Sequence, residues 1–319
     1  MDKDTKNHSK NKRASILDTL AQVEKAPTIE ACRGAKITLL KRARSKYISN
    51  NLALKLADLK TENYQSYFNT YHCAETLQQS GNRITGRYCN NRWCLTCNRI
   101  RTAKLIKGYD QVLSEMNDKR FVTLTVPNCS AETLQETIRE MIGTFKKIQK
   151  TFIKRKTAVV GIRKLEVTFN PARNDYHPHF HIICSGEHIS QELVNEWLKR
   201  YENASRGAQD DRAGDNNSVM ELFKYFTKIV TKGSIHLKAL DTIFNAMRGM
   251  RVFQPMGIKK NVTEEVTDIT SEVYSDLESR EANWDWIDSE TDWIDKETGE
   301  FLTGYKPSAN VTKVVNSTV

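Results

Sequence analysis

The stretch His177-Pro178-His179-Phe180-His181-Ile182-Ile183-Cys184 predicts a strand that presents two imidazoles on one face. Alternate residues of a strand share a face, so we expect His179 and His181 to point at one metal ion. Two imidazoles leave a divalent site incomplete. The preceding run, residues 161–169, supplies Glu166 on the expected antiparallel neighbour. Two histidines and one carboxylate would leave open positions for substrate oxygens and water.

Residues 218–230 are predicted to form a helix with three reactive side chains on one face. Glu221, Tyr225 and Lys228 stand at i, i+4 and i+7, which places them in one stripe. A tyrosine phenol titrates near pH 10, so it is a poor nucleophile unless a cation, a base or a polarised electrophile assists it. Lys228 supplies the cation, Glu221 supplies the base, and the neighbouring metal site would polarise the electrophile. Tyr225 is therefore the candidate nucleophile.

Each candidate also has a purely structural alternative. Tyr225 lies between Phe223 and Phe226 and could be a core tyrosine, with Tyr201 as a rival phenol. The two histidines could be ordinary sheet residues whose ring nitrogens are hydrogen-bonded within the protein. Glu166 could form an ion pair with a lysine or arginine on a neighbouring strand. Glu221 and Lys228 could be solvent-exposed charges on the helix surface. His177 is expected to be a supporting or turn residue and is not counted as a ligand.

Three ordered motifs give the chain a resemblance to a known family. They are Phe121–Asn128, the His-Pro-His-Phe-His run and Glu221–Lys228, within roughly residues 88–260. The chain resembles rolling-circle plasmid replication initiators (Rep proteins) of the HUH endonuclease superfamily, the type with a single catalytic tyrosine. Relaxases of that superfamily usually show a third histidine and an early tyrosine, and some transposases show paired tyrosines, whereas position 229 here is isoleucine.

The resemblance implies an enzyme that nicks single-stranded or hairpin origin DNA with Mg²⁺ or Mn²⁺ bound at His179, His181 and Glu166. Tyr225 would form a 5′-phosphotyrosine and release a 3′-hydroxyl for a host polymerase. Glu221, four residues before the tyrosine, would activate a water at termination, and Lys228 would offset phosphate charge. A host helicase is also expected, because the sequence has no phosphate-binding loop of the G-x-x-x-x-G-K type. A homodimer is compatible with this role.

Four of the seven cysteines cluster and predict a zinc site. Cys73, Cys89, Cys94 and Cys97 follow a C-x15-C-x4-C-x2-C spacing, and four thiolates make a closed tetrahedral site. His72 competes with Cys73 for the fourth position, and buried free thiols are the alternative to zinc. Cys32, Cys129 and Cys184 stand apart and are expected to be small core residues.

Composition indicates a basic protein of the cytoplasm. The net charge is +10, but residues 262–300 hold fourteen acids and two bases, a local charge of −12 that leaves +22 on the remainder. Such a body is expected to bind a polyanion. The sequence starts with polar residues and has no apolar stretch of the length that a membrane span needs, so we expect no membrane segment. Seven cysteines are not an even disulfide set, so we expect a reducing compartment. A non-catalytic, zinc-dependent nucleic-acid-binding regulator fits these features too.

The pattern along the core predicts an α+β fold. A strand at 120–126, a helix to about 152, strands near 159–169 and 178–185, a helix at 190–203 and a polar loop at 204–217 give the order β-α-β-β-α of a ferredoxin-like (RRM-like) antiparallel sheet with helices. We predict the following regions: a disordered basic tail (1–14), a basic helical region (15–72), the zinc-binding cluster (73–101), the HUH core (102–261) and an acidic, largely disordered tail (262–319) with a duplicated Asp-Trp-Ile-Asp element.

Overall fold

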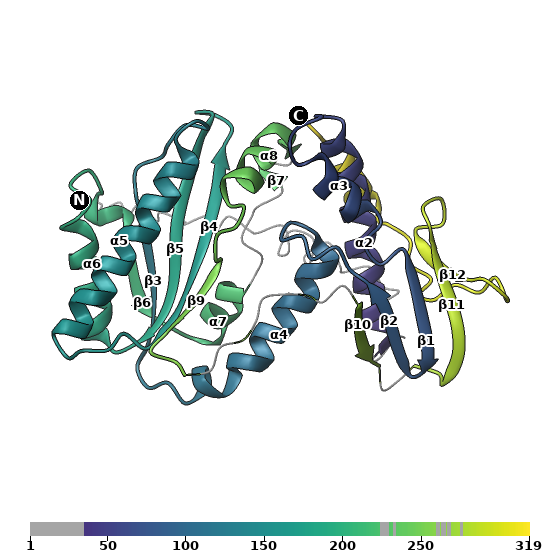
Figure 1. Cartoon of the computed structure of the whole chain (residues 1–319), viewed down its shortest axis with the longest axis horizontal. Coiled ribbons are helices and arrows are strands. Elements are labelled where there is room, and N and C mark those ends of the chain that lie inside the picture. The colour runs from purple at the N-terminus through teal and green to yellow at the C-terminus, as the bar shows by residue number, and fades with distance from the viewer. Residues whose placement is uncertain are drawn as a thin grey trace, which may run out of the picture.

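The described part of the fold contains two five-stranded antiparallel sheets with helices between them, and a small two-stranded sheet (Figure 1). The computed structural model describes residues 35–223, 230–231, 234–259, 262, 266, 269–274 and 277–319. The expected tail at 1–14 and the residues to 34 lie outside this part. No helix in the described ranges is both long and apolar enough to cross a membrane.

The central sheet has the strand order β6-β3-β5-β4-β9. In chain order, strand β3, helix α5, strands β4 and β5, helix α6 and strand β6 form a βαββαβ unit, and β3 lies between β5 and β6. This is the ferredoxin-like arrangement that the sequence predicts, with β9 added beside β4. The elements are β3 (Lys119–Thr125), α5 (Leu134–Lys154), β4 (Gly161–Asn170), β5 (Asp175–Ser185), α6 (Glu187–Leu198), β6 (Asp210–Ala213) and β9 (Phe253–Met256).

The β4–β5 hairpin fixes which side chains face each other. Its turn contains Asn174 with a φ of 53°, a left-handed conformation that asparagine tolerates. At the far end, a Cβ on Gly161 would lie 2.0 Å from the carbonyl oxygen of Ile183, so only glycine permits this approach of the strands. The resulting register pairs Glu166 with His179.

The two faces of the central sheet have different coverings. Helices α5 and α6 cover the face that carries Phe180, whose ring lies 5.5 Å from that of Phe145 and 5.7 Å from that of Trp197, measured between centroids. Because neighbouring residues of a strand alternate, His179 and His181 lie on the opposite face. Helix α7 (Asn216–Phe223) contacts β5 and α4 (Leu95–Ser114).

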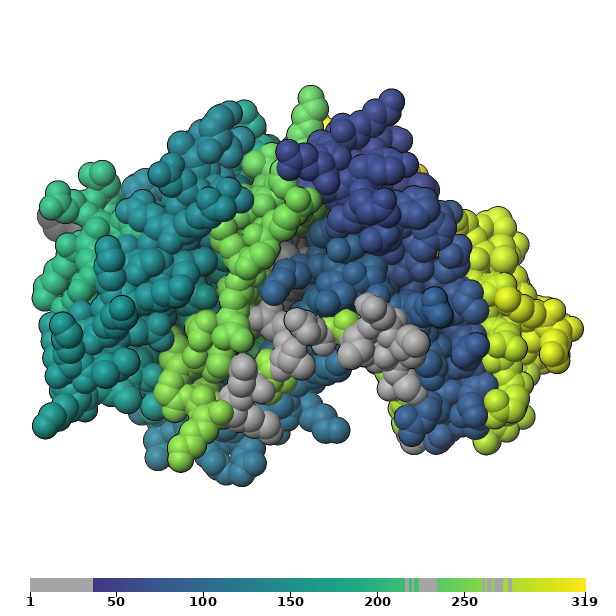
Figure 2. Space-filling model, viewed as in Figure 1, coloured from purple at the N-terminus to yellow at the C-terminus, as the bar shows by residue number. Residues whose placement is uncertain are grey.

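The second sheet corrects the prediction of a largely disordered tail. Its order is β10-β2-β1-β11-β12, so strands from the acidic segment flank the hairpin next to the cysteines. Trp284 and Trp293 are fully buried in its core, which explains why this acidic stretch is ordered. The C-terminal strands (yellow) pack against β1 and β2 (blue) at one end of the molecule (Figure 2). The elements are β1 (Thr76–Gly81), β2 (Arg83–Arg87), β10 (Ile269–Val273), β11 (Arg280–Ile287), β12 (Asp292–Asp295) and α9 (Ala309–Asn316).

Helices α2 (Ala35–Ala57) and α3 (Tyr64–Tyr71) connect the two sheets. The first half of α2 packs into the core of the second sheet, and its second half packs into the core of the central sheet. Asp241 on α8 (Leu237–Ala246) accepts hydrogen bonds from Thr61 and Asn63, both at 2.8 Å, and from Tyr67. The helical region predicted from the sequence therefore lies between the sheets.

The described residues contain only the first part of the predicted tyrosine helix. Helix α7 is described from Asn216 to Phe223, and residues 224–229 lie outside the described part. Val230, the last residue of the predicted helix, belongs to strand β7 (Val230–Thr231), which pairs with β8 (Ser234–Ile235). The preceding polar loop contains a 3₁₀ turn (Arg206–Ala208) and the edge strand β6, which the sequence analysis missed. Strand β6 is short, charged and half-exposed, so it lacks the apolar alternation that marks a strand.

Candidate metal centres

Glu166, His179 and His181 converge on the sheet face opposite α5. Each offers one ligand atom, and these atoms all lie within 4.8 Å of one another. The register explains the cluster: Glu166 lies directly across from His179, and His181 is two residues further along the same face. The three residues that the sequence names as a divalent metal site are therefore brought together.

Hydrogen bonds orient both imidazoles. His179 donates through Nδ1 to the backbone oxygen of His177 at 3.0 Å, which leaves Nε2 with its lone pair. His181 Nδ1 lies 3.2 Å from Thr123 Oγ1 on β3, and its Nε2 lies 3.6 Å from Glu166 Oε2. His177 thus contributes its backbone to the site and, in the described part of the chain, does not join the ligand cluster.

A buried lysine sets the charge of this centre. Lys164 is 1% exposed, and its Nζ lies 2.9 Å from Glu166 Oε2. Burial opposes ionisation of Glu166, but Lys164 and then the two histidines outweigh it and lower its pKa to about 2. Burial, followed by the charge of His179, lowers the pKa of His181 well below its usual value. An ionised carboxylate and a neutral imidazole are the forms that ligate Mg²⁺ or Mn²⁺, so this donor set fits a divalent cation.

Glu221 lies at the edge of the centre and not within it. Its carboxylate is half-exposed and accepts a hydrogen bond of 3.2 Å from Nη2 of Arg212 on β6. The Arg212 guanidinium stacks 4.4 Å from the Phe121 ring, whose centroid is 5.3 Å from that of His181. Glu221 is therefore connected to the metal face through Arg212. Tyr225 and Lys228 lie outside the described residues.

The four clustered cysteines form a second centre. The Sγ–Sγ distances are 3.5 Å between Cys73 and Cys97, 3.6 Å between Cys89 and Cys97, and 3.7 Å between Cys94 and Cys73. A tetrahedral zinc with Zn–S bonds of about 2.3 Å requires sulfur separations of roughly 3.8 Å. All four are free thiols, so the set fits a zinc ion. The Nδ1 atom of His72 lies 2.8 Å from Oε2 of Glu75 and not at the thiol cluster, so Cys73 is the fourth candidate ligand.

The surroundings of the thiols suit an anionic centre. Cys94 is the N-cap of α4, so the thiols of Cys94 and Cys97 lie at the positive end of the helix. Lys46 is 1% exposed and donates to the backbone oxygen of Tyr71 at 2.6 Å. Burial lowers its pKa, and the nearby Cys73 and Cys94 raise it. A buried ammonium group here would offset part of the negative charge if the four cysteines held one zinc ion as thiolates.

Comparison with known proteins places the chain in a family. The model of the family described as "Replication protein" matches residues 82–196. "Protein rep" of Staphylococcus aureus is 30% identical over 165 residues, which cover 44% of this chain and 69% of that relative. The chain belongs to the Rep family of plasmid replication initiators. A pneumococcal "Protein rep" from serotype 2 strain D39 is 24% identical over 66% of this Rep protein and 76% of its own length. "Protein rep" of Bacillus amyloliquefaciens is 36% identical over 124 residues, or 35% of the chain and 36% of that relative. No solved structure matches.

The family match covers part of the predicted machinery. It includes three of the four clustered cysteines and the whole Glu166–His179–His181 centre, and it ends before Glu221 and Tyr225. The functional roles of the last two residues therefore rest on the sequence motif.

Three residues of the site were missed by sequence analysis. Lys164 precedes Glu166 by two positions, so strand alternation already placed it on the same face. Thr123 and Arg212 carry no such signal, because they reach the site only through the pairing of β3 with β5 and of β3 with β6. A lysine two residues from a predicted ligand was the one available clue.

Replacing one clustered cysteine should remove zinc and unfold the second sheet. We expect Cys97→Ser to lose its zinc and at least about 3 kcal/mol of stability, because the metal would hold α4 to the hairpin. Metal analysis and thermal unfolding followed by the fluorescence of the buried tryptophans measure both effects. Cys129→Ser, outside the cluster, is the control. Full zinc retention by Cys97→Ser would exclude the assignment.

Removing the buried lysine should tighten divalent metal binding. Lys164→Met eliminates a cation next to Glu166, so we expect the Mn²⁺ affinity to rise roughly tenfold as charge repulsion disappears. Isothermal titration of the full-length protein measures this change. Lys119→Met, at the far end of the same sheet, is expected to leave affinity unchanged. A weaker site in Lys164→Met would show that the lysine supports metal binding.

Proposed function

We propose that this Rep protein nicks one strand of single-stranded or hairpin origin DNA and transfers it through a 5′-phosphotyrosine on Tyr225. The observation that supports the proposal most strongly is the buried centre of one ionised carboxylate and two oriented imidazoles. A divalent ion held there would polarise the scissile phosphate. The centre faces away from α5 and α6, on the side of the sheet where α7 lies.

The residues of the chain have complementary tasks in this scheme. The Tyr225 oxygen attacks phosphorus, the bond to the 3′ oxygen breaks, and that oxygen takes a proton and leaves as a 3′-hydroxyl. Lys228 would offset phosphate charge near the phenol or lower its pKa. A host polymerase would extend the free 3′ end, and a host helicase would open the duplex. The reaction is expected in the cytoplasm, with one or two copies of the chain.

Glu221 supports a distinct second step. Its carboxylate is half-exposed and paired with Arg212, so it is accessible to a water and held in place by the guanidinium. In the proposed termination, Glu221 removes a proton from water while that water attacks the second scissile phosphate, and the bond to the 3′ oxygen at that site breaks. This oxygen takes a proton and leaves as a 3′-hydroxyl, which can attack the phosphotyrosine and release the Tyr225 phenol. One tyrosine would then suffice for initiation, and hydrolysis would complete the cycle.

A non-catalytic, zinc-dependent DNA-binding regulator is the second candidate function. It is favoured by the four-cysteine centre, which does not depend on the nuclease face. It predicts binding to DNA without any covalent product. An HUH relaxase or transposase remains the alternative within the same chemistry.

Loss of the candidate nucleophile should abolish covalent attachment. Labelled single-stranded origin DNA incubated with the wild-type protein and Mn²⁺ is expected to give a denaturant-resistant protein–DNA adduct, and Tyr225→Phe none. Tyr201→Phe is the matched control. An adduct that persists in Tyr225→Phe would reject this nucleophile, and DNA binding with no adduct in any variant would favour the regulator.

Replacement of Glu221 should separate the two cuts. We expect Glu221→Gln to form the first adduct at the wild-type rate and to lose hydrolysis of the second site by at least about tenfold, the low end for removal of a general base. Both are followed on one labelled substrate with two sites. Equal loss of the two activities would sink the assignment of Glu221 to termination.

A further inference from the structure

The outer face of helix α5 carries a dense stripe of positive charge. Residues 141–156 contain six lysines and arginines and no acid. The spacing puts five exposed cations on the side opposite the buried stripe of Ile138, Phe145 and Ile148. We call this surface the α5 ridge. Its members are Arg139, Lys146, Lys147, Lys150 and Lys154.

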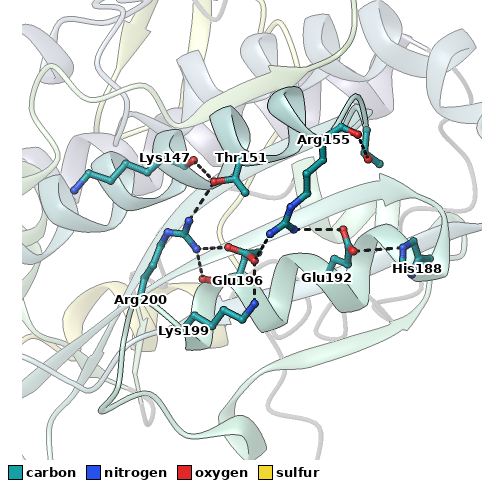
Figure 3. Close-up of polar contacts among 9 residues, drawn as sticks. Lys147, Thr151, Arg155, His188, Glu192, Glu196, Lys199 and Arg200 are labelled. Carbon is teal, nitrogen blue, oxygen red and sulfur yellow. Dashed lines mark hydrogen bonds and ion pairs between the residues drawn. The ribbon is translucent and has the colours of Figure 1, made fainter.

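Two acids of α6 near α5 are paired with other cations, whereas Glu136 and Glu140 are exposed in the first two turns of α5 itself. Figure 3 shows that Glu196, 4% exposed on α6, accepts from Arg155 at 3.0 Å, from Lys199 at 3.2 Å and from Arg200. Glu192 lies 4.0 Å from Arg155. Within the described part of the chain, no ion pair joins a ridge lysine to a carboxylate. The ridge charge is therefore available to an external anion.

The same network makes the ridge rigid. Arg200 donates through Nη2 to Thr151 Oγ1 at 3.2 Å, and that hydroxyl donates to the backbone oxygen of Lys147 at 3.1 Å (Figure 3). Together with the Arg155–Glu196 bond, these contacts attach the second half of α5 to α6. A fixed helix presents its lysines without first losing backbone freedom on binding.

Gly143 lies in the middle of the ridge, between Arg139 and Lys146. Glycine costs a helix interior about 1 kcal/mol relative to alanine. A Cβ at this position would meet no atom within 4 Å, so no contact within the described residues requires glycine here. A ligand that comes close to the helix backbone between Arg139 and Lys146 would require it.

Helix stability alone does not account for this pattern. Cations in the last turn offset the helix dipole, which explains Lys154. Lys146, Lys147 and Lys150 lie one to two turns earlier, beyond the reach of that effect. Their repulsion instead opposes the fold unless an anion binds.

We propose that the α5 ridge binds the phosphate backbone of duplex DNA, on the sheet face opposite the candidate nuclease centre. This inference rests on the proposed function, which brings origin DNA to the protein. Lysines are point charges suited to phosphates and carry no base-specific pattern, so the ridge positions the duplex without reading its sequence. Single strands bind through exposed aromatic side chains, whereas both phenylalanines of α5 are buried.

The test compares two charge-matched variants of the full chain. The ridge variant carries Lys146→Gln, Lys147→Gln, Lys150→Gln and Lys154→Gln. The control carries Lys238→Gln, Lys259→Gln, Lys306→Gln and Lys313→Gln, four exposed lysines elsewhere. Fluorescence anisotropy with a labelled origin duplex measures affinity as a function of salt, and cleavage of a short single-stranded origin oligonucleotide is measured in parallel.

The ridge variant is expected to bind duplex at least tenfold more weakly at physiological salt. Its slope of log affinity against log salt should become shallower by about 0.9 for each phosphate that the protein no longer neutralises, and the control slope should stay close to that of the wild type. Gly143→Leu, which keeps every charge and removes a helix-breaking glycine, should weaken duplex binding several-fold at an unchanged or higher Tm. Equal slopes for the ridge variant and the control would overturn the proposal, as would wild-type duplex affinity in both ridge-directed variants.

The two proposals fail in different ways. If single-stranded cleavage is absent from the wild type while the ridge variant loses duplex binding, the nuclease proposal fails and the ridge stands. If the ridge variant keeps duplex affinity but loses binding to an acidic protein from the host replication machinery, the surface is a protein interface and the ridge proposal is overturned.

Discussion

The pairing of β4 with β5 is the constraint on which the candidate nuclease centre depends. Side chains alternate along a strand, so a slip of one residue would send Glu166 to the face covered by α5 while its partners stayed behind. The close approach at Gly161 and the turn at Asn174 hold the two ends of this hairpin in register. The metal ligands need no further alignment, because the backbone ladder already places them opposite one another.

The hairpin also separates two environments with opposite requirements. One face buries Phe180 under two helices, and this apolar layer supports the sheet. The other face holds Glu166, Lys164 and two imidazoles in a partly buried setting where charge is expensive unless it is paired. Lys164 supplies that pairing through the contact of its Nζ with Glu166 Oε2, which stabilises the polar face.

Sequence reasoning recovered the features that depend on local periodicity. The alternation around His179, the amphipathic pattern of α5 and the cysteine spacing all correspond to what the structure brings together. Sequence reasoning failed for strands whose partners lie far away in the sequence. Strand β6 is too short and polar to be recognised alone. The acidic composition of residues 262–300 predicts disorder, whereas their tryptophans are buried because β11 pairs with β1. Lys164 was an oversight, since its position in the strand already placed it beside Glu166.

The second sheet joins the beginning of the described chain to its end. Strand β1 is paired on one side by β2, its neighbour in sequence, and on the other by β11, which is made about two hundred residues later. Leu77 and Ile84 of the β1–β2 hairpin therefore become fully buried only after strands β10, β11 and β12 have been synthesised. A chain that stopped before β11 would contain every strand of the central sheet and yet leave this apolar surface exposed. The fold thereby makes completion of translation a condition for a durable initiator.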